Sequence, residues 1–175
     1  MIAYDMHNLG GDLLNWLGAR LLEPILYIEG GWEYWLQIDF PAWLDVSTGQ
    51  QYDFRREYTI ENVRLDWMVN ETVGGNVFAV NLKAQTTKYV TSRLVSDVKK
   101  DIAKLEQVKR QRPTLNCLEV VAVIDLAAER ELTNLGFACW TTYRQAVVVL
   151  GKVIGGGNDE AMSTGTSETP LLLAT

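Results

Sequence analysis

The chain has 175 residues, of which 47% are hydrophobic, and it carries a formal net charge of −6. This length and composition fit one globular domain and argue against disorder, and no apolar run reaches the roughly 18 residues that span a membrane. The acidic balance disfavours nonspecific nucleic-acid binding. One histidine and two separated cysteines exclude the common zinc sites. No secretory signal opens the chain, so we expect a cytoplasmic protein.

The first part of the chain is predicted to form one helix and one strand. A helix is expected between Gly10-Gly11 and Pro24, because leucines recur at every fourth position. These leucines are Leu9, Leu13, Leu17 and Leu21. Residues 31–41 alternate between two sets of side chains, which predicts a strand closed by Pro41. Residues 45–53 are interpreted as a loop.

Two further strands joined by a hairpin follow. Residues 58–69 alternate and place Asp66 on the polar face of one strand. Residues 77–85 predict the second strand, and the Gly74-Gly75 pair between them is a hairpin signal. The polar face of the second strand carries Asn81, Lys83 and Gln85.

The hairpin fixes which side chains meet. If its loop is centred near Val73, the numbers of opposed residues sum to about 146 or 147, which places Asp66 opposite Val80 or Asn81. The apolar faces of both strands should share the core. We therefore expect Asp66, Asn81 and Lys83 to converge on one polar face.

The rest of the chain predicts an α/β domain with a mixed sheet flanked by helices. Residues 92–110 form the clearest helix, residues 117–125 a strand buried on both faces, and residues 126–136 a short helix that stops at Gly136. Residues 138–154 read as one last strand or a pair. We expect a single domain over residues 1–154 and a flexible tail over 155–175.

The side chains on the polar face suit metal chemistry. Asp66 offers carboxylate oxygens and Asn81 an amide oxygen, which are ligands that Mg²⁺ accepts. A bound cation activates water and stabilises charge on a phosphate, and Lys83 would add positive charge there. The competing interpretation is that Asp66 and Lys83 are solvated residues on an open sheet face.

The stretch from RLDW (64–67) through FAVNLKAQ (78–85) to SDVKKDIAKL (96–105) resembles the PD-(D/E)xK nuclease superfamily. With the first helix and VVAVID (120–125), the resemblance covers residues 9 to 150. It implies a restriction-endonuclease-like fold and a phosphodiesterase or nuclease that depends on Mg²⁺ or Mn²⁺. By this resemblance Asp66 would be the first metal ligand, Asn81 would occupy the second-acid position, and Lys83 would be the catalytic lysine. Gln85 would touch the phosphate or a metal-bound water.

Asn81 departs from the family pattern, because its amide carries no charge and one anion fewer should weaken Mg²⁺ binding. The superfamily includes active members with a neutral residue there, members with the acid on a neighbouring element, and members that have lost catalysis. Glu23 and Glu33 are the candidates for a relocated acid.

The functional alternative is a catalytically inactive nuclease-like fold that serves as a protein-interaction or assembly module, for example as a homodimer. A third interpretation gives the polar cleft unrelated chemistry. Basic side chains on the helix 92–110 offer local positive charge for nucleic acid, but Asp97 and Asp101 lie among them and dilute it. The basic residues are Lys99, Lys100, Lys104, Lys109 and Arg110.

Overall fold

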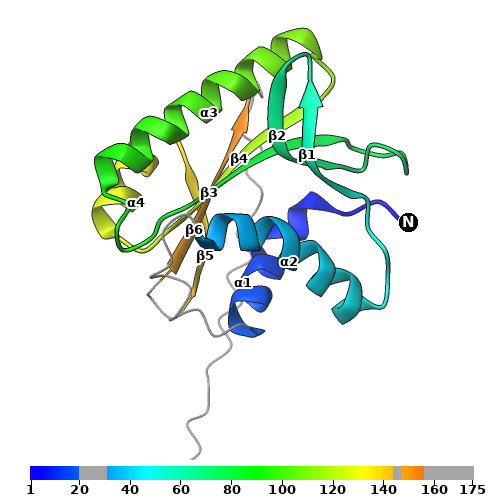
Figure 1. The fold of residues 1–175 in the computed structure, drawn as a ribbon, viewed down its shortest axis with the longest axis horizontal. Helices are drawn as coiled ribbons and strands as arrows, with labels where there is room; N and C mark the ends of the chain where they lie inside the picture. Colours follow the sequence, from blue (N-terminus) through cyan, green and yellow to red (C-terminus); the bar gives the residue numbers. More distant parts are fainter. Residues whose placement is uncertain (20–30, 144–146, 156–175) are drawn as a thin grey trace, which may run out of the picture.

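A mixed six-stranded sheet flanked by four helices forms the described part of the protein, which comprises residues 1–19, 31–143 and 147–155 of the computed structural model (Figure 1). After a 3₁₀ turn η1 (Met6–Asn8), the helices are α1 (Leu9–Ala19), α2 (Gly31–Thr48), α3 (Thr91–Gln111) and α4 (Leu126–Asn134). The strands are β1 (Phe54–Ile60), β2 (Val63–Val69), β3 (Phe78–Ala84), β4 (Asn116–Val123), β5 (Ala138–Tyr143) and β6 (Val147–Ile154). The predicted α/β class with a mixed sheet is confirmed.

The sheet lies between two helical layers. Its strand order is β1-β2-β3-β4-β6-β5, and β3 and β4 are parallel while the other neighbours are antiparallel. Helices α3 and α4 cover one face, and α1 and α2 cover the other (Figure 1). Each face is sealed by its own apolar side chains, which makes the hydrophobic effect the main force that holds the layers together.

The predicted strand at residues 31–41 is wrong, because these residues belong to helix α2. Its buried side chains, Trp32, Leu36, Phe40 and Leu44, recur at every fourth position, which is a helical period. Aromatic residues lie on the exposed face of this helix as well as on its buried face, for example Tyr34 beside Trp32. The sequence therefore shows the alternating pattern of a strand instead of the helical period. The predicted loop at residues 45–53 is also partly wrong, because α2 continues to Thr48.

Pro41 lies inside α2 rather than at its end. Proline has no backbone N–H, so the carbonyl four residues earlier, that of Gln37, loses its helical partner. The indole Nε1 of Trp67 donates to that carbonyl oxygen at 3.0 Å. A tertiary hydrogen bond from β2 thus replaces the missing helical one and fixes α2 against the sheet.

Helix α1 starts at Leu9, three residues earlier than predicted, so Gly10 and Gly11 lie within it. Gly10 faces β5, where a β-carbon would lie 3.1 Å from the Cβ atom of Trp140. Glycine at this position therefore allows α1 to approach the sheet closely. Leu21 and Pro24, which belong to the same prediction, lie outside the described residues.

The predicted single strand at residues 58–69 is two strands. Glu61 and Asn62 have φ angles of 44° and 71° and form a tight turn between β1 and β2, where Ile60 pairs with Val63. Two consecutive positive φ angles are typical of the two-residue hairpin turn that matches strand twist. The sequence lacks the glycine that usually marks such a turn, so β1 was missed.

The remaining elements agree with the sequence. Helix α3, strand β4 and helix α4 are confirmed, and Gly136 ends α4 with a φ of 84°. Residues 138–143 and 147–154 form a pair of strands, which is one of the two predicted alternatives. The predicted tail lies outside the described residues beyond Gly155. No described helix is both long and apolar enough to cross a membrane.

Candidate functional site

The register of β2 and β3 places Asp66 as the sequence predicted. Trp67 pairs with Val80, a sum of 147, so the next step along this register brings Asp66 opposite Asn81. The ladder stops at that step. The carboxylate Oδ2 of Asp66 accepts a hydrogen bond from the backbone N–H of Leu82 at 2.7 Å. The side chain of Asp66 thus satisfies a β3 donor that the neighbouring strand leaves unpaired.

The pairing of β2 with β1 is interrupted at the same level. Arg56 pairs with Trp67 and Tyr58 with Leu65, while Glu57, at a φ of 54°, and Asp66 are skipped. An interruption of this kind re-aims side chains next to it. The local irregularity of β1 therefore belongs to the geometry that sets Asp66.

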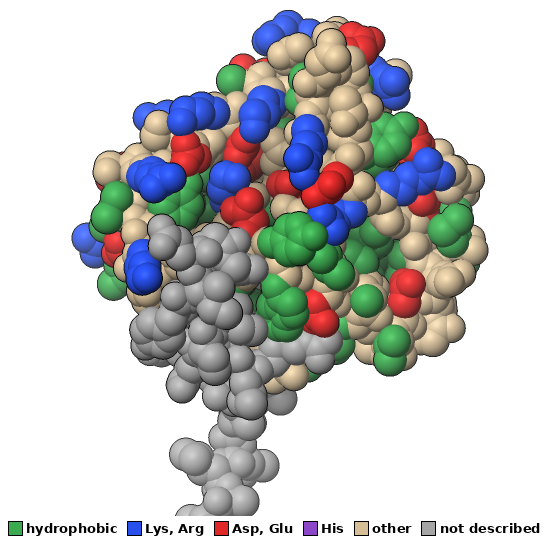
Figure 2. All heavy atoms as spheres, viewed as in Figure 1, with side chains coloured by type: hydrophobic (Ala, Val, Ile, Leu, Met, Phe, Trp, Pro, Cys, Tyr) green, Lys and Arg blue, Asp and Glu red, His purple; other side chains and the backbone are tan. Residues whose placement is uncertain are grey.

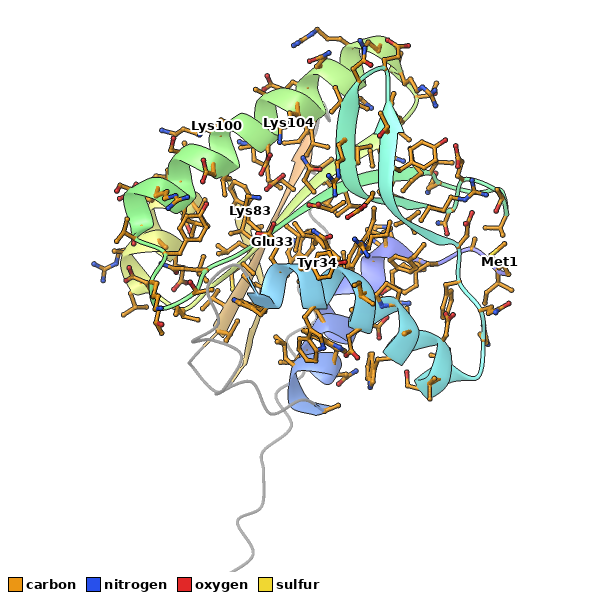
Figure 3. All side chains as sticks on the ribbon, viewed as in Figure 1. Met1, Glu33, Tyr34, Lys83, Lys100 and Lys104 are labelled. Carbon is orange, nitrogen blue, oxygen red and sulfur yellow. The ribbon has the colours of Figure 1, made fainter. Side chains whose placement is uncertain are left out.

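Lys83 lies between the two helical layers, where Figure 3 shows it beside Glu33 at the start of α2 and below Lys104 of α3. Its Nζ atom lies 3.3 Å from Oε1 of Glu33 and 3.2 Å from Oδ2 of Asp101. Burial alone would lower the pKa of Lys83, but the two carboxylates outweigh it and the pKa is raised. Lys83 therefore remains a cation at all ordinary pH values.

Glu33 is the relocated-acid candidate that the structure describes; Glu23 lies outside the described residues. Besides its contact with Lys83, its Oε2 accepts from the backbone N–H of Ala84 at 3.3 Å. Desolvation by burial raises the pKa of Glu33, and Lys83 partly offsets that rise. Helix α2, rather than the strand predicted for residues 31–41, brings this acid to the end of β3.

Asp66 is held from two sides. Its second oxygen, Oδ1, accepts from the side-chain Nε2 of Gln37 on α2 at 2.8 Å. Burial raises the pKa of Asp66, while the Leu82 N–H and Lys83 act in the opposite direction. Each carboxylate oxygen has two lone pairs, so these bonds leave acceptor capacity for another ligand.

The sequence places Asp101 among the surface lysines, but the residue is buried, with 5% of its surface exposed. It lies on the inner stripe of α3 and pairs with Lys83 and with Lys104, whose Nζ is 2.5 Å from its Oδ1. Figure 2 shows acidic side chains among the Lys and Arg side chains around α3. The positive charge of this helix is partly neutralised by its own acids, since Lys100 also pairs with Asp97 at 2.7 Å.

Glu119 is a residue that the sequence reasoning missed. It is fully buried on β4 and is the register partner of Asn81, which is 3% exposed. Within the described part of the chain, both carboxylate oxygens of Glu119 lack a hydrogen-bond partner, and so does the Nδ2 atom of Asn81. Complete burial and the nearby Asp101 raise the pKa of Glu119 well above its usual range. The signal was present as the one charged residue in the apolar run 117–123.

Gln85 supports the backbone instead of pointing into this cluster. Its Oε1 accepts from the N–H of Ile124 at 3.1 Å, and its Nε2 donates to the carbonyl of Tyr89 at 3.2 Å. Its own carbonyl accepts from the indole of Trp32 at 2.8 Å. The buried Gln85 side chain thus links the segments that follow β3 and β4.

We expect Gln85→Ala to destabilise the fold by about 2 kcal/mol, because it leaves two backbone groups near the core without partners. Urea denaturation would measure the change in unfolding free energy. Gln107→Ala, on the exposed side of α3, is the matched control and should shift stability by less than about 0.5 kcal/mol. Equal effects of the two substitutions would contradict the bridging role.

An open cavity of about 260 Å³ adjoins Glu33 and Lys83. Lys88 and Arg93 add two more cationic side chains to its wall, and Tyr89 lies under the Arg93 guanidinium, 5.5 Å from the ring centroid. The lining residues are Glu33, Lys83, Ala84, Thr86, Lys88, Tyr89 and Arg93. The cavity therefore presents cations to an anionic ligand immediately beside the carboxylates.

The oxygen donors suit a hard divalent cation, although the described residues contain no group of three or more His, Cys, Asp or Glu side chains arranged to hold a metal ion. Mg²⁺ keeps several waters and commonly takes only one or two carboxylates from the protein. Asp66 and the amide of Asn81, with unpartnered buried polar atoms beside them, meet that modest requirement.

Comparison with known proteins finds no relative: no family model, no curated protein and no solved structure matches this chain.

Proposed function

We propose that the protein is a divalent-metal-dependent phosphodiesterase of the PD-(D/E)xK type, with a restriction-endonuclease-like fold and a nucleic acid as its substrate. The observation that carries this proposal is the Lys83–Glu33 ion pair at the edge of a cationic cavity, with Asp66 on the neighbouring strand close enough to interact with both through charge. Perturbed pKa values in a cleft are themselves a feature of functional sites.

The order of elements supports the resemblance. Asp66 lies on the first strand of the β2–β3 hairpin, Lys83 lies on the second, and the long helix α3 follows directly. Helix α3 then leads to β4, which pairs with β3 in parallel. Asp66 and Lys83 thus lie on neighbouring strands, in the register that the hairpin predicts.

Each residue of the cluster has a distinct task in this proposal. Asp66, with the amide oxygen of Asn81, would hold Mg²⁺ or Mn²⁺. The bound cation would supply an acidified water and offset negative charge on the phosphate. Lys83 keeps its positive charge beside the reacting phosphate, and Glu33 fixes the position of its ammonium group.

The cavity suits the phosphate of the substrate. Lys88 and Arg93 reach it from the segment before α3 and the first turn of that helix. Arginine and lysine are the side chains that proteins use to bind phosphate oxygens. With a net charge of −6 over the whole chain, binding would depend on this local cationic surface and would weaken with salt.

Calorimetric titration with Mg²⁺ and with Mn²⁺ tests the proposal. Wild-type protein should bind the cation, and Asp66→Asn should weaken binding at least about 10-fold, because it removes the charge of a ligand with little change in shape. Glu131→Gln, an acid removed from the exposed face of α4, should bind like the wild type. Cleavage of DNA and RNA in the same cations follows. Absence of cation binding at millimolar concentration would refute the proposal.

The second candidate function is a protein-interaction or assembly module on the same fold. Two observations favour it: the neutral Asn81, and the exposure of Tyr34 and Ile38, which lie one turn apart on α2 and are 54% and 44% exposed. Apolar side chains grouped on a surface are typical of interaction sites. In that case the protein would bind no cation, and sedimentation would show self-association that Tyr34→Ser reduces.

A further inference from the structure

We propose that Glu119 on β4 provides the carboxylate that Asn81 lacks, so that Asp66 and Glu119, on either side of Asn81, are the two acidic ligands of the divalent cation. This inference rests on the proposed metal site and assigns to it a residue that lies outside the sequence motif. It also gives a reason for a fully buried acid in an otherwise apolar strand.

The three residues lie side by side across three neighbouring strands. The β2–β3 ladder ends at the pair Trp67–Val80, and one further step along the same register brings Asp66 opposite Asn81. The β3–β4 register pairs Asn81 with Glu119. Neighbouring strands are about 4.8 Å apart, so Asn81 separates the two acids by one strand on each side. Alternation places Asn81 and Glu119 on the face covered by α3, where Asp101 and Lys83 meet.

Glu119 differs from the other carboxylates in what its oxygens contact. Asp66, Glu33 and Asp101 each have both oxygens engaged by a donor within 3.3 Å. Neither oxygen of Glu119 has such a partner among the described residues. A buried carboxyl group without a partner costs stability, so its presence calls for a ligand.

The neighbouring amide points to the same conclusion. The Nδ2 atom of Asn81 is also buried without a partner. An amide at this position could donate from its nitrogen to a ligating carboxylate and offer its oxygen to the cation, which a second acid at position 81 could not do. In this chain the amide therefore stands on β3 and the unpartnered acid on β4.

The donor set meets the needs of Mg²⁺. Two carboxylates and one amide oxygen leave positions for water and phosphate in an octahedral shell. The cation would enter from solvent beside Asp66, which is half-buried, and would contact the fully buried Glu119 on its inner side.

The test exchanges the two residues. Calorimetry with Mn²⁺ compares the wild type with Glu119→Gln, with Asp66→Asn and with the double variant Asn81→Asp/Glu119→Gln. We expect Glu119→Gln to keep its thermal stability and to bind Mn²⁺ about 10-fold more weakly or worse. The double variant returns one carboxylate to the same cluster and should recover most of the affinity.

The outcomes separate this inference from the proposed function. Mn²⁺ binding that Asp66→Asn removes but Glu119→Gln leaves unchanged would overturn the role of Glu119 and leave the metal site standing. A loss of Mn²⁺ affinity in Glu119→Gln that the double variant fails to recover would also overturn the role of Glu119. A wild-type protein that binds no Mn²⁺ would refute both this inference and the proposed function. If Glu119→Gln does not fold, Glu119→Asp takes its place, because it keeps the carboxylate and shortens its reach. A folded Glu119→Asp protein that binds Mn²⁺ more weakly supports the role of Glu119, and unchanged binding overturns it.

Discussion

Lys83→Met is expected to abolish phosphodiester cleavage and to destabilise the protein by about 2–3 kcal/mol. Loss of one partner from a buried ion pair costs about 3–5 kcal/mol, and the 25% exposure of Glu33 reduces that figure. Glu33 would then be left as a half-buried carboxylate with only the Ala84 N–H, while Asp101 keeps Lys104. Urea denaturation gives the change in unfolding free energy, and a nuclease assay gives the change in activity.

Two control variants isolate the cause. Lys100→Met removes a lysine that is 68% exposed and pairs with Asp97 on the surface, so its effect on stability should stay below about 0.5 kcal/mol. The double variant Glu33→Gln/Lys83→Met removes both charges and should recover part of the stability lost in Lys83→Met. If Lys83→Met and Lys100→Met lower the free energy of unfolding by the same amount, the buried ion pairs of Lys83 do not stabilise the protein.

Trp67→Ala should have the largest effect on folding, a loss of about 3–5 kcal/mol, as for other large-to-small substitutions in cores. Trp67 is fully buried and stacks on Phe40 of α2 at 5.7 Å between ring centroids. It is also the donor to the Gln37 carbonyl that Pro41 leaves unpaired. The free energy of unfolding, measured by urea denaturation followed by tryptophan fluorescence, tests this expectation.

Trp67→Phe separates packing from hydrogen bonding. The variant keeps an aromatic ring but leaves the Gln37 carbonyl without its donor, so we expect a loss of about 1–3 kcal/mol. The same substitution combined with Pro41→Ala should cost less, since alanine restores the backbone donor within α2. A Trp67→Phe variant as stable as the wild type would show that solvent or another group satisfies the carbonyl.

Local patterns predicted the elements that have strong periodicity or glycine-marked ends. Helix α3 has a clear apolar stripe, and the Gly74-Gly75 loop fixes the β2–β3 register to within one residue. Helix α2 could not be predicted in this way, because its aromatic residues occupy outer as well as inner positions and Pro41 signals an end. The donor that replaces the missing N–H of Pro41 comes from Trp67 on β2, and a tertiary contact of this kind is not visible in a local pattern.

The same distinction divides the residues of the site. Asp66, Asn81 and Lys83 belong to one hairpin, so sequence alternation and a turn were enough to bring them together. Glu33 and Glu119 come from α2 and β4, whose places beside β3 depend on packing and on the crossover through α3. No local pattern reports which strand lies on the other side of β3, so Glu119, the β4 neighbour of Asn81, could not be deduced.

Gln37 attaches α2 to β2 at two points: its backbone carbonyl accepts from Trp67, and its side chain donates to Asp66. A helix that slipped by one residue would move about 1.5 Å along its axis and turn about 100°. Such a slip would break both bonds at once and carry Glu33 away from Lys83. The two-point attachment thus sets the register of α2, and insertion or deletion of a single residue between Glu33 and Gln37 would separate the acid from the lysine even if the helix itself still formed.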